Sequence, residues 1–465
     1  MKIELLGGGK KEELEERIKT IAAAGKLSRF SGNVFEVLES CDNYEKNLKL
    51  IKRIIKMGHK SIIEHDYLVF AISDITPIVE QTIIGNRLTS FTVKSRREVD
   101  FRNVGFYIPE FRDNEGNMHK DNKKIKEKYI KHMKWLFEKY AELVDQGISK
   151  EDARFILPYC YNGNLIMGLD GRELEAIIKR LIYGKESNIA ELKELGMKLK
   201  EIVDKNVPYL SESIVEPNKI ENQEYIETLI KRPEIKILEK VQLLNFTPNP
   251  DKTVLEAHIM YKYQCTRSEA QNILKEMKQK DENIESKLMK VILNQNEKRE
   301  LEQVNFQFQI PISLAVLTHL TRHRMHSLLI PDFVPMWNLE NYIIPESIKK
   351  LNEQEYIKIY KKNQEIYNEI KSLGVNENDL VYFYLSGNMC NVITTINART
   401  MQWISRLRCC NKAQWQIRNI VKDMVKLVRK EAPEIGKGLG ATCSSEGICY
   451  EGKEYCGIVK NIIVK

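Results

Sequence analysis

The chain has 465 residues, a length that exceeds one ordinary domain and predicts two or three. An apolar fraction of 42% with a charged fraction of 30% excludes a disordered chain and predicts a globular one. A formal charge of +8 is small for this length, so the chain lacks the dense basic surface of a nucleic-acid-binding protein, and its longest uncharged runs are too polar to cross a membrane.

The N-terminal segment becomes charged within ten residues, unlike a signal peptide, and we expect a cytoplasmic protein. In the first half, the spacing of apolar residues predicts amphipathic helices, and alternation of apolar residues predicts a strand over 67–73. Thr76 followed by Pro77 is a typical helix start. The predicted helices of this half cover 10–26, 44–56, 77–87, 120–140 and 172–204.

The stretch 211–240 is polar and charged and contains prolines, and we therefore predict a linker there. After it the pattern starts again, with an alternating segment over 306–310 that predicts a strand. The predicted helices of the second half cover 254–279, 286–301, 311–321, 353–372 and 399–430.

The two halves share an order of elements and some residues. Val79 and Val316 begin similar segments 237 positions apart, and both segments carry an Arg and a Ser at matching places. A second pair of similar segments starts at Arg154 and Val381. We therefore predict a tandem duplication, with a first domain, a linker and a second domain that ends in a cysteine-containing tail, over 1–210, 211–240 and 241–465.

Arg322, His323 and Arg324 directly follow a predicted apolar helix. The planar guanidinium group of Arg grips phosphate or flavin-ring oxygens in a bidentate manner. A structural role, in which one Arg pairs with a carboxylate and the other is solvated, is the alternative. The spacing of His319, His323 and His326 is one that metal sites use, but the flanking Arg residues disfavour a bound cation, and we predict no metal site here.

Two further groups of polar residues can bind a phosphate or a pyrimidine. Ser95 and Arg97 lie on a predicted loop, and a hydroxyl two residues from an Arg suits such a ligand, although a solvated loop gives the same pattern. Asn397 and Arg399 lie at a predicted helix start, where they can present donors to a cofactor or stand as ordinary exposed side chains.

The C-terminal tail holds Cys443, Cys449 and Cys456, with Cys409 and Cys410 upstream. Three thiols within 14 residues can indicate zinc or an iron–sulfur cluster, while the odd total of nine cysteines argues against a disulfide framework. Free thiols or a redox pair are the other interpretations. In each case we predict that these cysteines are structural or metal-binding and do not act as nucleophiles.

At Arg322-His-Arg-x-x-Ser327 the sequence resembles the flavin-dependent thymidylate synthase family, whose signature is Arg-His-Arg-x-x-Ser-x-Asn-Glu-x-Ser-x-Arg-Tyr. The segment from Thr395 to Arg418 resembles the C-terminal segment of the same family. The second half departs from the signature at Leu329 and Ile330, where the family has Asn and Glu.

The first half resembles this family in complementary places. His65 fits its histidine-containing flavin motif, and Ser95 and Arg97 fit the later part of the signature, whose leading Arg and His this half lacks. Arg154 lies in a match to the family's Ala-Arg-x-x-Leu-Pro motif, which the second half has lost at Val381.

The resemblance implies an α+β fold built as two tandem copies of a thymidylate-synthase-like domain of the flavin-dependent type, each with helices around a small antiparallel sheet. The family assembles as a homotetramer with sites between subunits. The resemblance therefore implies that this chain forms a homodimer, in which two copies of the domain from each of two chains make a pseudo-tetramer. A site shared between copies needs each side chain once, so each copy can lose what the other supplies.

The resemblance also implies FAD-dependent methylation of dUMP to dTMP, with methylenetetrahydrofolate as carbon donor and NADPH as reductant. The residues that would hold FAD are His65, Arg322, His323, Arg324, Asn397 and Arg399. Those that would hold dUMP are Ser95, Arg97, Arg154 and Arg408, with Ser95, Arg97 and Arg408 as the catalytic residues. A non-catalytic flavin- or nucleotide-binding homologue with degenerate sites is the alternative, and neither interpretation involves a membrane or nucleic acid.

Overall fold

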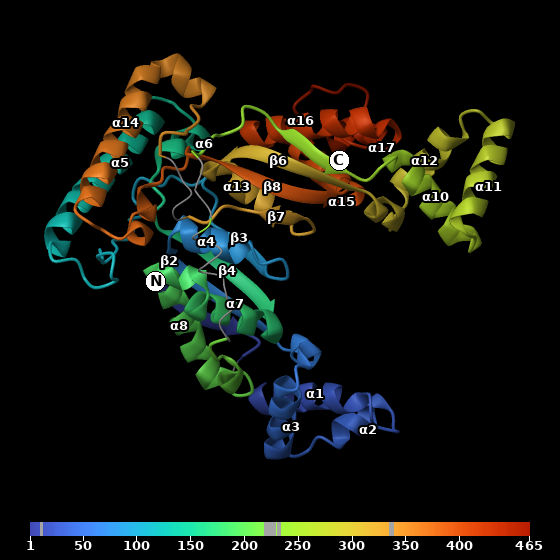
Figure 1. Ribbon diagram of the computed structural model, residues 1–465, viewed down its shortest axis with the longest axis horizontal. Coiled ribbons are helices and arrows are strands. Elements are labelled where there is room, and N and C mark those ends of the chain that lie inside the picture. The colour runs from blue at the N-terminus through green and yellow to red at the C-terminus, as the bar shows by residue number, and fades with distance from the viewer. Residues whose placement is uncertain (10–12, 218–228, 230–233, 334–338) are drawn as a thin grey trace. The chain divides into compact units, whose positions relative to one another are not determined.

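The structure is a computed structural model that describes residues 1–9, 13–217, 229, 234–333 and 339–465 (Figure 1). The predicted helix start at Lys10 and most of the predicted linker after residue 217 lie outside the described residues. The chain divides into two compact units. Unit 1 comprises Met1–Glu234, Phe333–Glu340 and Ile344–Ser386, and unit 2 comprises Ile235–Asp332, Asn341–Ile343 and Gly387–Lys465.

Unit 1 is built on a four-stranded antiparallel sheet in the order β1-β2-β4-β3. Its strands are β1 (Lys2–Gly7), β2 (Tyr67–Ile75), β3 (Ser90–Val93) and β4 (Gly163–Asp170). In β2, alternate residues are buried, among them Leu68, Phe70 and Ile72. This alternation confirms the strand predicted over 67–73 and places one face of the sheet against the core.

The helices of unit 1 include one that comes from the second half of the sequence, α14. They are α1 (Leu14–Leu27), α2 (Val34–Glu39), α3 (Tyr44–Lys56), α4 (Pro77–Ile84), α5 (Asn122–Asp145), α6 (Lys150–Ala153), α7 (Gly171–Tyr183), α8 (Ala190–Asn206) and α14 (Glu346–Ser372). The predicted helix over 172–204 is wrong as one element, since Gly184 ends α7 and a short 3-10 turn precedes α8.

Unit 2 repeats the same sheet, in the order β5-β6-β8-β7. Its strands are β5 (Gln242–Phe246), β6 (Asn305–Ser313), β7 (Ser327–Leu329) and β8 (Met389–Asn397). A short parallel pair, β9 (Ile448–Cys449) with β10 (Ile463–Val464), holds the C-terminal tail. The helix predicted to start at Pro311 starts three residues later, because Pro311 still pairs with Asn391 of β8.

The helices of unit 2 are shorter than the sequence predicts. They are α10 (Pro250–Tyr263), α11 (Arg267–Lys280), α12 (Ile284–Asn294), α13 (Leu314–Thr321), α15 (Ala398–Arg408), α16 (Trp415–Glu431), α17 (Pro433–Lys437) and α18 (Thr442–Ser445). The predicted helix over 254–279 is broken at Gln264, whose φ of 51° is left-handed and cannot continue a right-handed helix.

The tandem duplication is confirmed by the shared strand order and by the helices that follow each second strand. Helix α4 starts after β2 and α13 starts after β6, and both span eight residues at the 237-residue offset that relates Val79 to Val316. The molecule therefore contains two copies of one α+β domain with a small antiparallel sheet.

Within unit 1, segments from the two copies meet in a symmetric way. Helix α14 of the second copy packs on α5 of the first (Figure 1). Pro158 and Leu385 form an antiparallel β-bridge. On one side of it, Tyr159 N–H donates to Tyr384 O over 2.6 Å, and on the other Ser386 N–H donates to Leu157 O over 2.9 Å. Since these are corresponding segments of the two copies, the bridge relates these two short segments of unit 1 by a local two-fold symmetry.

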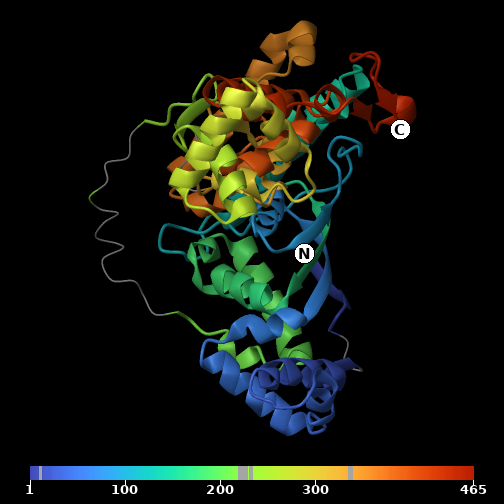
Figure 2. The same ribbon diagram turned by 90° about the vertical axis from the view of Figure 1, so that its right-hand side faces the viewer.

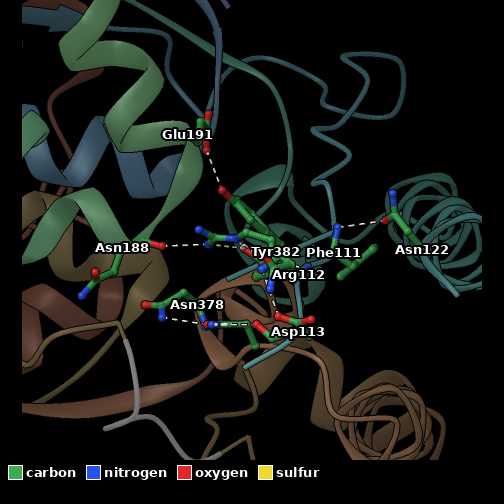
Figure 3. A network of polar contacts seen from close by, with 11 residues as sticks. Phe111, Arg112, Asp113, Asn122, Asn188, Glu191, Asn378 and Tyr382 are labelled. Carbon is green, nitrogen blue, oxygen red and sulfur yellow. Dashed lines mark hydrogen bonds and ion pairs between the residues drawn. The ribbon is translucent and has the colours of Figure 1, made fainter. Parts of the chain in front are cut away.

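A polar network in unit 1 strengthens this meeting of the copies (Figure 3). The Arg112 guanidinium binds the buried carboxylate of Asp379, with Nη2 2.6 Å from Oδ1, and the Arg112 N–H donates to Oδ2 over 2.8 Å. The same guanidinium donates to Asn188 O over 2.8 Å. The Tyr382 hydroxyl donates to Glu191 Oε2 over 3.2 Å. A segment of the second copy is thus held by side chains of the first.

No helix in the described part of the chain is long and apolar enough to cross a membrane.

Candidate nucleotide and flavin sites

In unit 1, two predicted substrate residues follow the end of β3. Ser95 and Arg97 are half-buried on the loop, and the Arg97 N–H donates to Ser95 Oγ over 3.3 Å. The Arg97 guanidinium forms an ion pair with Glu151, which lies on α6. The loop therefore presents a hydroxyl and a guanidinium together, as the sequence predicts, and a carboxylate holds the guanidinium in place.

The third substrate residue of this unit, Arg154, is almost fully buried, with 2% of its surface exposed. Its Nε donates to Glu151 O over 3.1 Å, while among the described residues its Nη2 has no hydrogen-bond partner. Burial and the repulsion of Arg96 lower the pKa of Arg154 to about 10. A buried guanidinium nitrogen without a partner is costly, and an anion or a carbonyl oxygen of a ligand would satisfy it.

The sequence analysis did not single out Arg96, which the structure places beside Arg154. Arg96 Nη2 lies 2.8 Å from Glu80 Oε1 in a buried ion pair, and its Nη1 donates to the Tyr161 hydroxyl. Burial by itself would lower the pKa of Arg96, but the charge of Glu80 and the nearby Tyr161 and Tyr159 together outweigh burial, and the pKa stands above the ordinary value. One feature of the sequence could have indicated this contact. Glu80 is the only acidic residue in the apolar helix α4, and a buried carboxylate needs a cation as its partner.

Together these groups form an arginine cluster, defined as Arg96, Arg97 and Arg154 with the carboxylates of Glu80 and Glu151. Three positive charges face two negative ones, so the cluster carries a net positive charge of one. Such an excess in a buried setting favours an anionic ligand.

His65, a predicted flavin residue, is exposed at the end of a 3-10 helix over Lys60–His65. Its neighbours fix the backbone on both sides. Glu64 pairs with Arg172, with Oε1 and Nη1 2.6 Å apart, and the buried Asp66 receives two hydrogen bonds from Arg17, at 2.8 and 2.5 Å. The imidazole is therefore presented to solvent from a rigid base.

In unit 2, the Arg-His-Arg triplet lies where α13 ends, as predicted. Arg322 and Arg324 are exposed, and His323 between them is buried. Arg408 of α15 donates from Nε to His323 Nε2 over 2.9 Å. Burial and the charges of Arg408 and Arg322 lower the pKa of His323 to about 3. His323 is therefore neutral and its Nε2 accepts, which places the proton of the ring on Nδ1.

The other two histidines of this region are also buried. His326 Nδ1 lies 2.6 Å from Thr394 Oγ1, and His319 lies on α13. In the part of the chain that the structure describes, no three His, Cys, Asp or Glu side chains are arranged to hold a single metal ion.

Asn397 and Arg399 lie at the start of α15. The Asn397 side-chain oxygen caps this helix by accepting from Thr400 N–H over 2.8 Å, which leaves the amide nitrogen as a donor for a ligand. Arg399 Nη1 lies 2.5 Å from Glu302 Oε1. Both residues are half-buried at the helix start, and their role in holding a cofactor stays a prediction.

The predicted residues thus fall into two groups. Unit 1 holds His65, Ser95, Arg97 and Arg154, and unit 2 holds Arg322, His323, Arg324, Asn397, Arg399 and Arg408. The structure brings Ser95, Arg97 and Arg154 into one cluster around Glu151, and it joins Arg408 to the triplet through His323. A composite site that combines the two groups stays a prediction.

Fold and site together define a duplicated α+β protein with an arginine cluster suited to an anionic ligand. The chain belongs to the family described as thymidylate synthase complementing protein, Thy1, whose model matches residues 12–209 and 242–434. Each of the two matched segments corresponds to one copy of the domain, which confirms the family resemblance of the sequence.

Individual relatives match about half of the chain. A flavin-dependent thymidylate synthase of Clostridium tetani is 30% identical over 239 residues, which cover 47% of this chain and 93% of that protein. One of Thermococcus onnurineus is 29% identical over 226 residues, covering 46% of this chain and 90% of that protein. Among solved structures, a UMP/dUMP methylase, PolB, from Streptomyces cacaoi bound with 5-Br dUMP has 20% identity and a TM-score of 0.38, covering 46% of this chain and 97% of that one.

Proposed function

We propose that this protein methylates dUMP to dTMP with FAD as cofactor, methylenetetrahydrofolate as carbon donor and NADPH as reductant. Membership of the thymidylate synthase complementing protein family and relatives named flavin-dependent thymidylate synthase support this reaction. The observation that carries the proposal is Arg154, a buried guanidinium whose Nη2 has no partner among the described residues. A nucleotide oxygen would complete its hydrogen bonding.

On the substrate side, Ser95, Arg97, Arg154 and Arg408 bind dUMP. The guanidinium groups pair with the phosphate and with the uracil carbonyl oxygens, and the Ser95 hydroxyl adds a neutral donor. During methylation negative charge develops on the uracil ring. Arginine side chains fixed in advance by partners such as Glu151 stabilise that charge without reorganising at the moment of reaction.

On the cofactor side, His65, Arg322, His323, Arg324, Asn397 and Arg399 bind FAD. The exposed arginines on either side of His323 suit the pyrophosphate, and the exposed His65 and the Asn397 amide suit the polar edge of a flavin ring. These donors are those that a flavin dinucleotide needs, so the residues fit the group. FAD supplies the redox chemistry when bound, and the side chains hold and orient it.

Each copy supplies only some of the proposed binding residues, because each lacks residues that the other has. Val381 is buried in the second copy at the position that corresponds to Arg154 in the first. Conversely, Arg408 has Leu181 as its counterpart in the first copy. Each chain therefore carries the residues named above once, and they would be combined from both copies within a chain or across a homodimer that forms a pseudo-tetramer.

A second candidate function is a non-catalytic flavin- or nucleotide-binding homologue. The observation that favours it is the absence of the signature Asn and Glu from both copies, at Leu329 and Ile330 in the second and Thr92 and Val93 in the first. Both candidates predict a yellow protein that retains flavin. Tritium release from 5-labelled dUMP separates them, because the non-catalytic protein releases none.

The role of the triplet has its own test, in which the FAD affinity of Arg322→Ala is compared with that of the natural chain. Loss of one charged hydrogen bond should weaken FAD binding by about 1.5–3 kcal/mol. Arg53→Ala, a change of an exposed Arg at the end of α3, is the control. Equal flavin affinity in all three proteins would show that the triplet has a structural role.

A further inference from the structure

A cavity of about 350 Å³ lies in unit 2 between the end of α15, helix α16 and the C-terminal tail. Five of the nine cysteines of the chain line it, although the sequence spreads them over nearly fifty residues. They are Cys409, Cys410, Cys443, Cys449 and Cys456. None of them forms a disulfide.

Separate elements deliver these thiols to one place. Cys409 caps α15 and Cys410 follows it, Cys443 lies on α18, Cys449 lies on β9, and Cys456 follows a short 3-10 turn. Strand β10 pairs in parallel with β9, which places Val464 opposite Cys449. The tail that contains these strands is the red segment at the C label in Figure 2.

Ion pairs hold the C-terminal tail against the end of α15 and the loop that follows it, beside the cavity. Lys412 Nζ lies 2.7 Å from Glu454 Oε2, and Arg406 pairs with Glu446. Arg429 of α16 donates from Nη2 to Leu439 O over 2.7 Å, which holds the chain just before the tail begins. The thiols are thus positioned by specific contacts on both sides of the cavity.

The five thiols share this one cavity, and among them Cys449 is buried and Cys456 is exposed. Burial and the proximity of the thiols of Cys410, Cys449 and Cys456 raise the pKa of Cys443. Burial also raises the pKa of Cys409 to about 11, against the opposing charges of Lys422 and Arg429. The cavity wall adds Lys412, Lys422, Lys426 and Arg429, together with Glu451.

We propose that this cavity binds a [4Fe–4S] cluster through Cys410, Cys443, Cys449 and Cys456. Four cysteine thiolates are the usual ligands of such a cluster. In the described part of the chain no three donors converge on the position of a single ion, which disfavours mononuclear zinc. A cluster differs because its iron atoms occupy separate corners. It therefore suits thiols that surround a volume rather than meet at a point.

The charge of the wall matches this ligand. Four thiolates on a cluster core of charge +2 leave a net charge of −2. The cationic side chains of Lys412, Lys422, Lys426 and Arg429 offset that charge, while Glu451 opposes part of the effect. Cys409 is the fifth thiol and lies beside Lys422 and Arg429, where it lines the wall without being needed as a ligand.

Loading requires no change of oxidation state. A preformed cluster that carries four small thiolate ligands exchanges them one at a time for the protein thiols. At each exchange an iron–sulfur bond to the small thiolate breaks and one to the cysteine forms, and the proton of the cysteine passes to the leaving thiolate. Four such exchanges release four small thiols and move no electrons.

In the test, the preformed cluster is added to the purified chain in the absence of oxygen. Unbound cluster is then removed, and the iron and acid-labile sulfide bound to the protein are measured. We expect about four iron and four sulfide per chain, and a paramagnetic signal after reduction that flavin does not give. The triple change Cys443→Ser, Cys449→Ser, Cys456→Ser should lose this uptake. Cys265→Ser, a change of a cysteine outside the cavity, should keep it.

Two outcomes would overturn the assignment. One is uptake by the natural chain no greater than by the triple variant, with no signal after reduction. The other is stoichiometric binding of zinc alone by these thiols with no uptake of the cluster. In both outcomes the natural chain itself fails to take up the cluster, so misfolding of the variant cannot hide them. Flavin content is recorded in parallel and distinguishes failure here from failure of the proposed FAD site, since no cavity residue belongs to that site.

Discussion

His132 Nε2 lies 2.8 Å from Asn363 Oδ1 where α5 packs on α14, although 231 residues separate them in the sequence. Burial lowers the pKa of His132 to about 4, so the neutral ring donates to the amide oxygen. Asn363 in turn donates from Nδ2 to Phe383 O over 2.8 Å. Because α5 belongs to the first copy and α14 to the second, the hydrogen bond between His132 and Asn363 joins the two copies within unit 1, and the one to Phe383 O fixes the Asn363 side chain.

The ion pair between Arg112 and Asp379 joins the same two copies, and its removal should destabilise unit 1 strongly. Asp379 is 1% exposed and Arg112 supplies its buried cation. Arg112→Met should lower the free energy of unfolding by about 3–5 kcal/mol, because it leaves a buried carboxylate without a partner. Denaturant unfolding of Arg112→Met, Asp379→Asn and the double variant measures the coupling. If the effects of the two single changes were additive in the double variant, the predicted interaction between Arg112 and Asp379 would be contradicted.

Glu191 makes the stability of unit 1 depend on pH. Burial raises the pKa of this carboxyl to about 7, even though Thr76 and Tyr382 donate hydrogen bonds to it. The folded state therefore favours the protonated form. Its stabilising contribution is complete below the unfolded pKa of about 4.3 and is lost as pH rises through about 7.

The test compares Glu191→Gln with the natural chain at about pH 5 and about pH 8. The difference in unfolding free energy between the two proteins should change by an amount on the order of 3 kcal/mol in favour of the variant at the higher pH. Glu201→Gln, a change of an exposed carboxylate on the same helix α8, is the control. A difference that stays constant with pH would show that Glu191 does not titrate in this range.

The duplication and the positions of the candidate residues could be predicted from sequence because they leave local signals. Val79 and Val316 repeat with their neighbours, and Arg322 to Arg324 is a dense cationic run. Arg96 was missed because its importance comes from Glu80, and a contact between α4 and a later loop has no local signature. The same holds for α14, whose helical pattern is clear but whose packing on α5 depends on the fold of both copies.

Helix ends were predicted less well than helices, for reasons that lie in single residues. Thr76 does precede α4, but its hydroxyl donates to Glu191 over 2.6 Å instead of capping the helix. Gln264 adopts a left-handed conformation that ends α10, although Gln carries no sequence signal for such a turn. A contact with a residue distant in sequence decides the first case.

We expect Arg154 to strengthen dUMP binding without adding to the stability of the fold. The lowered pKa of about 10 means that the fold disfavours its charged form, so Arg154→Met should leave the thermal midpoint unchanged or raise it. The same change should weaken dUMP binding by at least about tenfold, through loss of charged hydrogen bonds. Calorimetric titration with dUMP measures the second effect, with Arg53→Met as control. Unchanged dUMP affinity would remove Arg154 from the substrate site.

His323 should remain neutral across the physiological range. With a pKa of about 3, its folded form favours the neutral ring, so its contribution to stability is complete above the unfolded pKa of about 6.5 and is lost as pH falls toward 3. An NMR titration of the histidine ring protons, with the His323 signal identified by its loss in His323→Asn, should show no midpoint above about pH 5. Arg408→Met should move the midpoint upward, and a midpoint near 6.5 in the natural chain would contradict the burial described here.

The most direct test of the central claim is tritium release from 5-labelled dUMP by the purified chain. We expect release when FAD, NADPH and methylenetetrahydrofolate are all present, with dTMP formed in equal amount, and loss of release in Arg154→Met and in Arg408→Met. A chain that retains flavin and binds dUMP but releases no tritium under these conditions would contradict the proposed reaction and identify a non-catalytic member of the family.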